Sequence, residues 1–445
     1  MARIPRQKRI LKSEVKGIVS IRIRGFKSFL KESHISIKPL TILAGSNSSG
    51  KSSIFQPILL MKQTLDESYD PGALQLNGPN VKFSSSSQII SMGSESAEFF
   101  VEVENGSGEK VGITYIKREE SKAGFEIKNM KIKQGKTNIK LEESMNEADV
   151  VSAMKEVRGD GFQYYYNKDL TPTIVRNRCF LDIGLYDKEE NGYILYQQRT
   201  TFLIERNIRN IMHLPGLRGN PERNYPVTAV DFERMNFSGT FEKYVASIIA
   251  QWKDTQNVVM LNVLKINLKK LGLAKNIDTK YINDTEIAIY VSRSNSSDDD
   301  DIVSIADVGL GLSQTLPILV ALQVAKEGQI VYIEQPEIHL HPRAQYELAT
   351  IFSDAIARGV KIVAETHSSV FLRGIQTLVA SKEIPQEKVK LHWFLRDSQT
   401  GYSFVESADL DDTGSFGEWP EDFDDTNLTA EANYLNAVEK RLLGE

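Results

Sequence analysis

Residues 40–65 read LTILAGSNSSGKSSIFQPILLMKQTL, and they carry the clearest structural signal in the chain. Residues 40–43 form a short apolar run that predicts a buried strand. The next segment, GSNSSGKS at 45–52, matches the phosphate-loop pattern G-x-x-x-x-G-K-[ST] at every position. An amphipathic run follows and predicts a helix. Strand, glycine-bearing loop and helix in this order are the context in which the pattern binds nucleotide phosphates.

The residue types in this loop suit a nucleoside triphosphate. Glycines allow backbone N–H groups to close around phosphate, and the start of the following helix adds a favourable dipole. We expect Lys51 to reach the β- and γ-phosphates and the Ser52 hydroxyl to ligate Mg²⁺. The expected cofactors are therefore ATP and Mg²⁺, and the loop residues expected at the nucleotide are Asn47, Ser48, Ser49, Gly50, Lys51, Ser52 and Ser53.

The composition of the 445-residue chain is typical of a globular protein. It has 41% hydrophobic and 25% charged residues, and its length suggests two or three domains. No apolar run approaches the roughly 20 residues that span a bilayer, and no signal-peptide pattern opens the chain. The single cysteine, Cys179, excludes an internal disulfide and fits a small core residue. We therefore expect a cytoplasmic protein without a membrane partner.

The net charge of −5 excludes a chain coated in basic surface. Any nucleic-acid binding must therefore use a local patch. Residues 1–17 form one basic segment, with Lys or Arg at positions 3, 6, 8, 9, 12 and 16. Two interpretations of this segment stay open, a nucleic-acid contact and a solvated tail.

Alternating strands are predicted on both sides of the loop. Residues 18–29 and 33–37 alternate apolar and polar side chains, and residues 98–140 do so around turns, which predicts an antiparallel meander. Two such strands ahead of a phosphate loop, with GFKSF at 25–29, resemble the N-terminal lobe of ATP-binding-cassette ATPases of the structural-maintenance-of-chromosomes type. The resemblance implies that Lys27 lies near the base or ribose. It also implies that a glutamine beyond the loop's helix, here Gln88, helps to hold Mg²⁺.

The middle of the chain is harder to interpret. Residues 141–209 show helical stretches but no heptad repeat, so a long coiled-coil arm is excluded and a compact insertion is expected. Residues 211–225, IMHLPGLRGNPERNY, place Arg218 and Arg223 around Gly219 and Pro221. Two arginines on a rigid loop can clamp phosphate or carboxylate, and a structural loop is the alternative.

A second glycine-bearing helix start lies at residues 307–314, DVGLGLSQ, ahead of an apolar helical run. Glycines at a helix N-terminus form an anion-binding end. In the cassette ATPases this position holds the signature motif, which binds the γ-phosphate of the other subunit. The resemblance places Gly309 and Gly311 in the motif's Ser-Gly-Gly slots, with Ser313 as a substitute for the missing serine.

Residues 329–342, QIVYIEQPEIHLHP, predict a buried strand that ends in Glu334. An acid at this end of a strand orients Mg²⁺ in phosphate-loop sheets. The cassette ATPases usually follow it with a second acid that polarises the attacking water, and Gln335 stands there instead. Because glutamine cannot accept a proton at neutral pH, we expect slow hydrolysis, with Glu337 or Glu365 as partial substitutes. The resemblance also implies that His367, after the strand at 361–365, is the switch histidine at the γ-phosphate.

Two further patterns invite a metal-site interpretation. His339 and His341 are two positions apart, but the resemblance implies instead a loop that touches the opposite subunit. Near the end of the chain an acidic, aromatic stretch follows a predicted strand pair at 389–394 and 401–406. Its carboxylates allow two interpretations, a solvated docking lobe and a nuclease metal site, and they are Asp409, Asp411, Asp412, Glu418 and Asp424.

The predicted fold class is α/β, an ATP-binding-cassette-type phosphate-loop NTPase. It combines a mixed central sheet, an antiparallel sub-sheet, a helical insertion and a small C-terminal α+β lobe. The predicted parts are a basic tail at 1–17, an N-terminal ATPase lobe at 18–140, a compact insertion at 141–209, a C-terminal ATPase lobe at 210–375 and a last lobe at 376–445.

The ordered motifs resemble bacterial stand-alone cassette-type ATPases, related to the chromosome-maintenance, recombination-mediator (RecF-type) and overcoming-lysogenization-defect families. The segments IEQPEIHLHP and FGEWPEDFDD further resemble segments of the ATPase subunits of two-gene anti-phage systems such as Septu. This implies an ATP-gated switch, a head-to-tail homodimer or higher oligomer that controls a nuclease partner or engages nucleic acid. The alternatives are a self-sufficient metal-dependent nuclease and a DNA-repair ATPase of the RecF type.

Overall fold

The phosphate loop lies at the end of an inner strand of a six-stranded sheet. The structure is a computed structural model that describes residues 16–118, 124–158, 170–187, 194–198, 200–230, 236–292, 302–417, 432–439 and 441. Every residue of the inner strand is buried, as expected for a strand covered on both faces. The order of the strands is β11 (Met212–Leu214), β16 (Ile330–Glu334), β17 (Lys361–Glu365), β3 (Leu40–Gly45), β18 (Val389–Arg396) and β19 (Ser403–Ala408).

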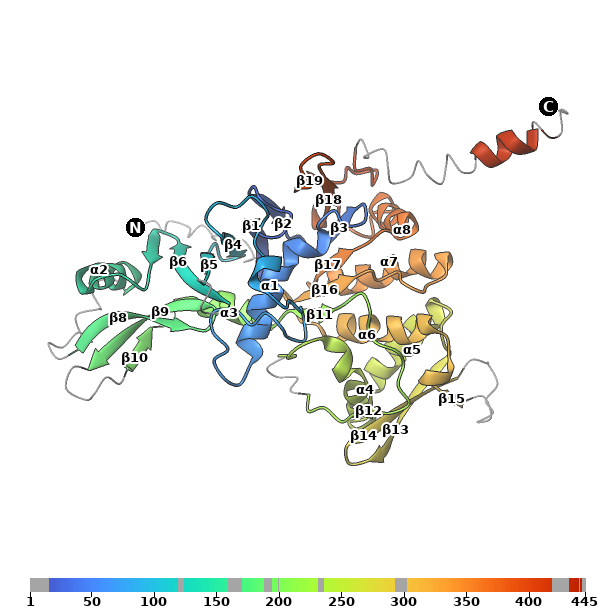
Figure 1. The fold of residues 1–445 in the computed structure, drawn as a ribbon. Helices are drawn as coiled ribbons and strands as arrows, with labels where there is room; N and C mark the ends of the chain where they lie inside the picture. The colour runs from blue at the N-terminus through green and yellow to red at the C-terminus, as the bar shows by residue number, and fades with distance from the viewer. Residues whose placement is uncertain are drawn as a thin grey trace, which may run out of the picture.

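Five of these strands run parallel, and only β19 is antiparallel to its neighbour β18. Successive side chains of β3 enter two different cores, because side chains alternate between the faces of a sheet. Ile42 packs with the core that contains α6 (Leu310–Val324), α7 (Pro342–Ala357) and α8 (Ser369–Ala380). Leu43 packs with the core that contains α1 (Lys51–Asp66). The central sheet therefore lies between α1 on one face and α6 to α8 on the other (Figure 1).

A second six-stranded sheet is antiparallel throughout and confirms the predicted meander. Its buried side chains alternate along the strands and share the core that contains α1. In order across the sheet its strands are β2 (Ser33–Ser36), β1 (Ile18–Arg24), β4 (Glu98–Asn105), β5 (Lys110–Lys117), β6 (Phe125–Gln134) and β7 (Thr137–Leu141). A short 3-10 helix, Ser86–Gln88, lies in the long segment between α1 and β4.

The region predicted as a helical insertion contains strands as well as helices. Between α2 (Glu147–Arg158) and α3 (Phe202–Arg209) lies an antiparallel sheet of β8 (Leu170–Asn177), β9 (Phe180–Asp187) and β10 (Ile194–Gln198). Pro172 sits on β8, which is an edge strand, where a missing N–H costs no ladder bond. That proline obscures the strand pattern in the sequence. Arg178, in the β8–β9 turn, donates to three carbonyl oxygens at the C-terminal end of α1.

A fourth sheet packs beside α6 and below the central sheet (Figure 1). It contains β12 (Tyr225–Pro226), β14 (Glu286–Ser292), β13 (Asn276–Asn283) and β15 (Ile302–Ser304). The helices α4 (Val245–Asp254) and α5 (Val258–Lys270) pack between this sheet and α6, with the 3-10 helices Phe241–Tyr244 and Ile305–Asp307 beside them.

The strand pair predicted in the last 70 residues is present, but it does not form a lobe of its own. Val389 to Phe394 on β18 pair with the phosphate-loop strand β3, so both strands extend the central sheet. The reason is hydrophobic: β18 is buried along most of its length and completes the core around β3.

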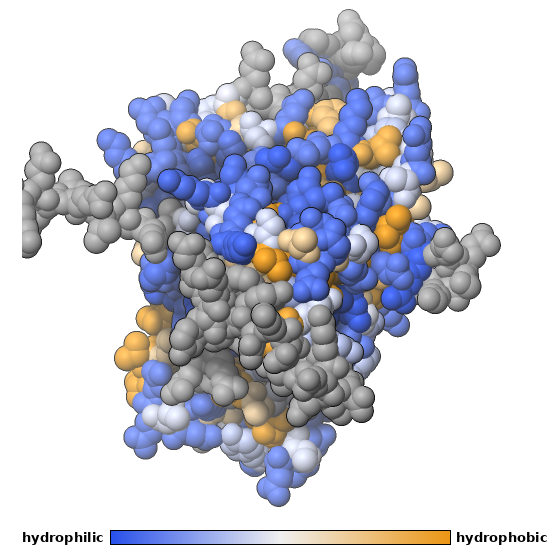
Figure 2. Space-filling model, turned by 90° about the vertical axis from the view of Figure 1, so that its left-hand side faces the viewer, coloured by the Kyte–Doolittle hydropathy of each residue, from blue (hydrophilic) through white to orange (hydrophobic). Residues whose placement is uncertain are grey.

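The surface of the molecule is mainly polar on the side that carries the insertion. Figure 2 shows this face, where hydrophilic residues predominate and hydrophobic ones occur in small groups. Within the described ranges, no helix is both long enough and apolar enough to cross a membrane. Cys179 is fully buried and free, as predicted for a core residue.

Candidate functional site

A cavity of about 710 Å³ lies at the carboxyl end of β3. Its wall combines residues from the phosphate loop, the GFKSF turn, the loop before β4, the ends of β16 and β17, and the β18–β19 turn. Its volume falls in the range of roughly 300–1,000 Å³ that small-molecule pockets occupy. Ten of the residues expected at the nucleotide or its metal line it, namely Lys27, Asn47, Ser48, Gly50, Lys51, Ser52, Ser53, Gln88, Gln335 and His367.

Two glycines of the phosphate loop are required by close backbone contacts. Gly45 has φ 142°, and a Cβ there would lie 2.3 Å from the carbonyl oxygen of Phe394. Gly50 has φ 101°, and a Cβ there would lie 2.9 Å from the Ser403 hydroxyl oxygen. The contacting atoms belong to Phe394 on β18 and Ser403 on β19, which pack directly against the loop. No L-residue fits these positions without strain, so the loop pattern is required by this packing as well as by its ligand chemistry.

Lys51 lies within the loop that it follows. Its Nζ donates to the carbonyl oxygens of Gly45, at 3.0 Å, and Ser46, at 2.7 Å. Burial lowers the pKa of Lys51, although the carboxyl groups of Glu365 and Glu337 oppose the shift. The ammonium group is thus surrounded by oxygen atoms at the base of the cavity, where a polyphosphate would find a cation.

The carboxyl group that contacts Ser52 belongs to Glu365 rather than to Glu334. Ser52 donates from its hydroxyl to Glu365 Oε2 at 2.7 Å, and the Tyr332 hydroxyl donates to the other oxygen. Glu365 is 4% exposed, and it lies opposite Glu334 in the parallel pairing of β16 and β17. Burial, reinforced by the charge of Glu334, raises the pKa of Glu365 to about 7. The Ser52 hydroxyl, which is expected to ligate Mg²⁺, is therefore hydrogen-bonded to Glu365. The sequence suggested Glu365 only as a partial substitute for the acid that Gln335 replaces.

Glu334 points to a different set of partners. His213 on β11 lies with its Nε2 3.2 Å from Glu334 Oε1, and the backbone N–H of Gly216 donates to Oε2 at 3.1 Å. Burial alone raises the pKa of Glu334, but these two bonds and the charges of His213 and Arg218 outweigh it and lower the pKa. The Glu334 carboxylate is therefore held in its charged form, beside the cavity and not among its lining residues.

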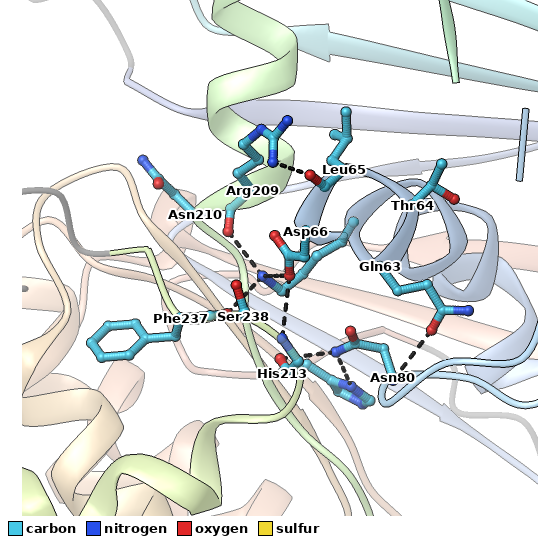
Figure 3. A network of polar contacts seen from close by, with 12 residues as sticks. Gln63, Thr64, Leu65, Asp66, Asn80, Arg209, Asn210, His213, Phe237 and Ser238 are labelled. Carbon is cyan, nitrogen blue, oxygen red and sulfur yellow. Dashed lines mark hydrogen bonds and ion pairs between the residues drawn. The ribbon is translucent and has the colours of Figure 1, made fainter. Parts of the chain in front are cut away.

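His213 is oriented in turn by Asn80. The Asn80 amide nitrogen lies 3.1 Å from His213 Nδ1 and donates to the carbonyl oxygen of Gly239 at 3.1 Å. Figure 3 shows Asn80 between Gln63 of α1 and His213. Because the amide donates to Nδ1, a neutral imidazole carries its proton on Nε2 and donates it to Glu334. The sequence offered no signal for this pair, since a single histidine in a short apolar strand has no distinctive neighbours.

Gln335 and His367 occupy the turns that follow β16 and β17. Gln335 has φ 45°, a left-handed conformation, and its N–H donates to the Glu365 carbonyl at 2.8 Å. The N–H of His367 donates to Glu337 Oε1 at 2.8 Å. Burial, with the charge of Lys51, lowers the pKa of His367 and favours its neutral form. Both side chains reach the cavity, as their predicted roles require.

Lys27 and Gln88 also line the cavity. Lys27 Nζ donates to Gln56 Oε1 at 3.1 Å and lies 5.4 Å from the centre of the Phe83 ring. Gln88 accepts a hydrogen bond from the N–H of Ser84 at 3.0 Å. The lining residues Arg396 and Tyr402, from β18 and the β18–β19 turn, had no counterpart among the predictions.

The remaining predicted nucleotide residues lie outside this cavity. Ser49 is fully buried behind the loop. Gly309 is exposed and precedes α6 without a side-chain cap, and Gly311 lies close to the carbonyl of His339. Ser313 lines a separate cavity of about 480 Å³ beside Arg218. The signature segment therefore does not complete the nucleotide site of its own chain.

The clamp interpretation of Arg218 and Arg223 is wrong. Arg218 is 6% exposed and donates to main-chain carbonyl oxygens, including that of Glu334 at 2.6 Å. Arg223 is exposed and forms an ion pair with Asp307 at 2.7 Å. The loop between β11 and β12 is instead a structural support at the end of the central sheet, because the buried side chain of Arg218 donates to main-chain carbonyl oxygens of α6 and of the end of β16.

Neither metal-site interpretation finds a cluster in the described ranges, where no group of three or more His, Cys, Asp or Glu residues could hold a metal ion. His341 caps the start of α7. Asp409 accepts from Lys38 and Lys390, and Asp411 accepts from groups of its own turn. Glu418 and Asp424 lie outside the described residues, as do residues 1–15 of the basic segment.

The residues around the main cavity fit a magnesium nucleotide. Lysine and backbone N–H groups suit phosphate, while hydroxyl, carboxylate and amide oxygens are the ligands that Mg²⁺ prefers. The Ser52 hydroxyl, the Glu365 carboxyl and the Gln88 amide supply such oxygens in the cavity wall, and Glu334 lies opposite Glu365 on the neighbouring strand. Ligand chemistry and position therefore agree.

Comparisons with solved structures find chromosome-maintenance head domains. The head domain bound to the C-winged helix domain of ScpA is 13% identical, with 89% of this chain and 98% of that chain covered and a TM-score of 0.46. The head domain from Thermotoga maritima is 10% identical, with coverages of 88% and 98% and a TM-score of 0.40. A head domain with an extended coiled coil, bound to the C-terminal domain of ScpA derived from Pyrococcus furiosus, is 12% identical, with coverages of 88% and 96% and a TM-score of 0.46.

Among curated proteins none matches the sequence. A family match, in contrast, covers residues 40–373, which include the phosphate loop, α6, β16 and the histidine turn. Its description is "AAA domain, putative AbiEii toxin, Type IV TA system". The match spans most of the chain and every element that lines the nucleotide cavity except those before β3 and after α8. The chain therefore belongs to this AAA domain family and is an ATPase of that type.

Proposed function

We propose that this chain is an ATP-gated switch that binds ATP with Mg²⁺, assembles head to tail with a second copy and hydrolyses its nucleotide slowly. One observation carries the proposal. Lys51, Ser52, Gln335 and His367 line a single cavity, while the glycine end of α6 lies outside it. A complete site then needs two chains.

The position of Gly309 and Gly311 supports the proposed dimer. Gly309 is exposed, and the first turn of α6 has no side-chain cap. The N–H groups of such a turn are available to an anion. Two chains related by a two-fold axis would each offer this end to the phosphates held by the other. ATP then stabilises the closed pair, because it binds the pair better than the single chain.

The side chains at the ends of β16 and β17 support the proposal of slow hydrolysis. Gln335 can orient water but cannot accept its proton. Glu365 already accepts hydrogen bonds from Ser52 and Tyr332, so it is poorly placed to act as the base. A general base contributes about 10²–10⁴-fold to the rate. Bound Mg²⁺, held by Ser52 with Glu334 or Glu365 and Gln88, would supply charge neutralisation at the phosphates.

The proposed role is the control of a partner nuclease in bacterial anti-phage defence, in a reducing cytosol, with residues 18–140 and 210–375 as the two ATPase lobes and 141–209 as the partner-facing insertion. The support is the resemblance of the IEQPEIHLHP segment and the acidic tail to such systems. Nucleic-acid engagement, as in RecF-type repair ATPases, is the second candidate. A nuclease activity of this chain alone is less favoured, since the described carboxylates do not form a metal cluster.

The test measures ATP binding, sedimentation and single-turnover hydrolysis. Lys51→Ala should weaken ATP binding by about 100-fold and abolish ATP-dependent dimers, because a buried cation is lost from the phosphate site. Gln335→Glu should accelerate hydrolysis by about tenfold or more, because it restores a base. The exposed variants Lys269→Ala and Gln134→Glu are the matched controls. ATP-dependent dimers in Lys51→Ala, or an unchanged rate in Gln335→Glu, would contradict the proposal.

A further inference from the structure

The side chain of Arg218 connects the start of α6 with the end of β16. Its Nη2 donates to the Glu334 carbonyl oxygen at 2.6 Å, and its Nη1 donates to the Gln314 carbonyl oxygen on α6 at 3.2 Å. The backbone adds two bonds in opposite directions. Arg218 N–H donates to Gln314 Oε1 at 3.1 Å, and Gln314 Nε2 donates to the Gly219 carbonyl at 2.6 Å. The β11–β12 loop is therefore bound firmly to α6.

The other end of this connection is the turn that carries Gln335. The loop N–H of Gly216 donates to Glu334, and a Cβ on Gly216 would lie 3.7 Å from Gln335 Oε1. Gln335 itself adopts a left-handed conformation, which a non-glycine residue keeps only where its surroundings hold it. The Arg218 loop is one of those supports. A shift of the loop would consequently move the group that faces the attacking water.

A guanidinium group can hold acceptors on two different elements in a fixed geometry, whereas an ammonium group cannot. The guanidinium fork is planar, whereas lysine offers a point charge on a flexible stem. Arg218 is buried, and its two Nη atoms donate to neutral carbonyl oxygens, with no ion pair to a carboxylate among the residues that the structure describes. Packing alone would not need this charged group. Its position between α6 and β16 is what requires an explanation.

We propose that Arg218 is a positioning residue, which transmits movement of the glycine end of α6 to Gln335. This inference rests on the proposed function, in which that end of α6 meets the nucleotide bound by the partner chain. Gln314 lies one turn beyond Gly309–Gly311 and moves with them. Arg218 carries the movement to the Glu334 carbonyl and so to Gln335. Hydrolysis in one site then depends on the nucleotide in the other.

The test compares Arg218→Lys with the wild type by amide hydrogen exchange and steady-state ATP hydrolysis. Without nucleotide, the variant should exchange about tenfold faster in residues 334–338, because a charge-assisted bond is lost there. With ATP, protection should persist in residues 309–316 and be lost in 334–338. The kcat should fall about tenfold with KM unchanged, since the ground-state contacts to ATP remain. Arg223→Lys, an exposed pair partner of Asp307, is the control.

Gln314→Ala provides a second variant that keeps the bond between Arg218 and Glu334. It should retain nucleotide-free protection in 334–338 and lose only the ATP-dependent part. Failure of the proposed dimer would give a different result: wild-type protein would bind ATP but remain monomeric, and ATP would not slow amide exchange in residues 309–316. The nucleotide-free comparison remains decisive in that case. Equal exchange in 334–338 for Arg218→Lys and the wild type would overturn the positioning role.

Discussion

Replacing Lys62 by methionine removes a fully buried cation from the C-terminal half of α1. Figure 3 shows the surroundings, with Asp66 of α1 close to Arg209 and Phe237. Lys62 is 0% exposed, and its Nζ donates to Asp66 Oδ2 at 3.0 Å and to the carbonyl oxygens of Arg209, at 2.9 Å, and Phe237, at 2.8 Å. These contacts connect the phosphate-loop helix to segments more than 140 positions further along the chain. Methionine keeps the apolar stem and removes the donors.

The expected loss follows from the groups that remain. Asp66 has a side chain that is 6% exposed and would keep only the N–H of Gly239, at 3.2 Å, among the donors described here. Breaking a buried ion pair by removing one partner costs about 3–5 kcal/mol. The double variant Lys62→Met, Asp66→Leu removes the uncompensated carboxylate as well, so it should lose less than the sum of the single variants.

Urea unfolding followed by tryptophan fluorescence measures these differences in the free energy of unfolding. Lys269→Met, on the exposed face of α5, is the matched control and should change the free energy by less than about 0.5 kcal/mol. If Lys62→Met costs less than about 1 kcal/mol, or the two single losses simply add, the buried pair does not hold α1 in place and the reasoning is refuted.

Two further predictions concern the loop and the strand beside it. Gly50→Ala should reduce ATP affinity by about tenfold or more, because φ is 101° and the added Cβ would lie 2.9 Å from the Ser403 hydroxyl oxygen, so that the loop must shift. Gly135→Ala, where nothing lies within 4 Å of the added Cβ, is the control. Unchanged ATP affinity in Gly50→Ala would contradict this prediction. His392 is buried between the Ser36 carbonyl and Ser407, and burial lowers its pKa to about 4. The contribution of the neutral His392 to stability is complete above the unfolded pKa of about 6.5 and is lost, by up to about 3 kcal/mol, as the pH falls toward 4. His392→Gln should therefore flatten the dependence of the urea midpoint on pH between these values. An equal slope in both proteins would refute this prediction.

The sequence alone was sufficient to predict those features that depend on residues close together in the chain. The run of small residues that closes on Lys51 and Ser52, and the apolar strand before it, depend only on adjacent positions, so their pattern predicts their structure. The same holds for the alternating strands of the meander, where the side-chain period reflects a half-buried sheet. Gln335 and His367 could be placed at strand ends for the same reason, and both lie in the cavity.

The partners of these groups depended on which strands lie side by side. Glu365 meets Ser52 across 313 positions because β17 is the neighbour of β3, and the one-to-one pairing of β16 with β17 places Glu334 opposite it. His213 reaches Glu334 only because β11 joins the edge of the same sheet. No local pattern records such adjacency, since it results from the burial of whole strands and helices together. Hence the sequence indicated a phosphate site, and the packing of the sheet selected the acid, the histidine and the arginine around it.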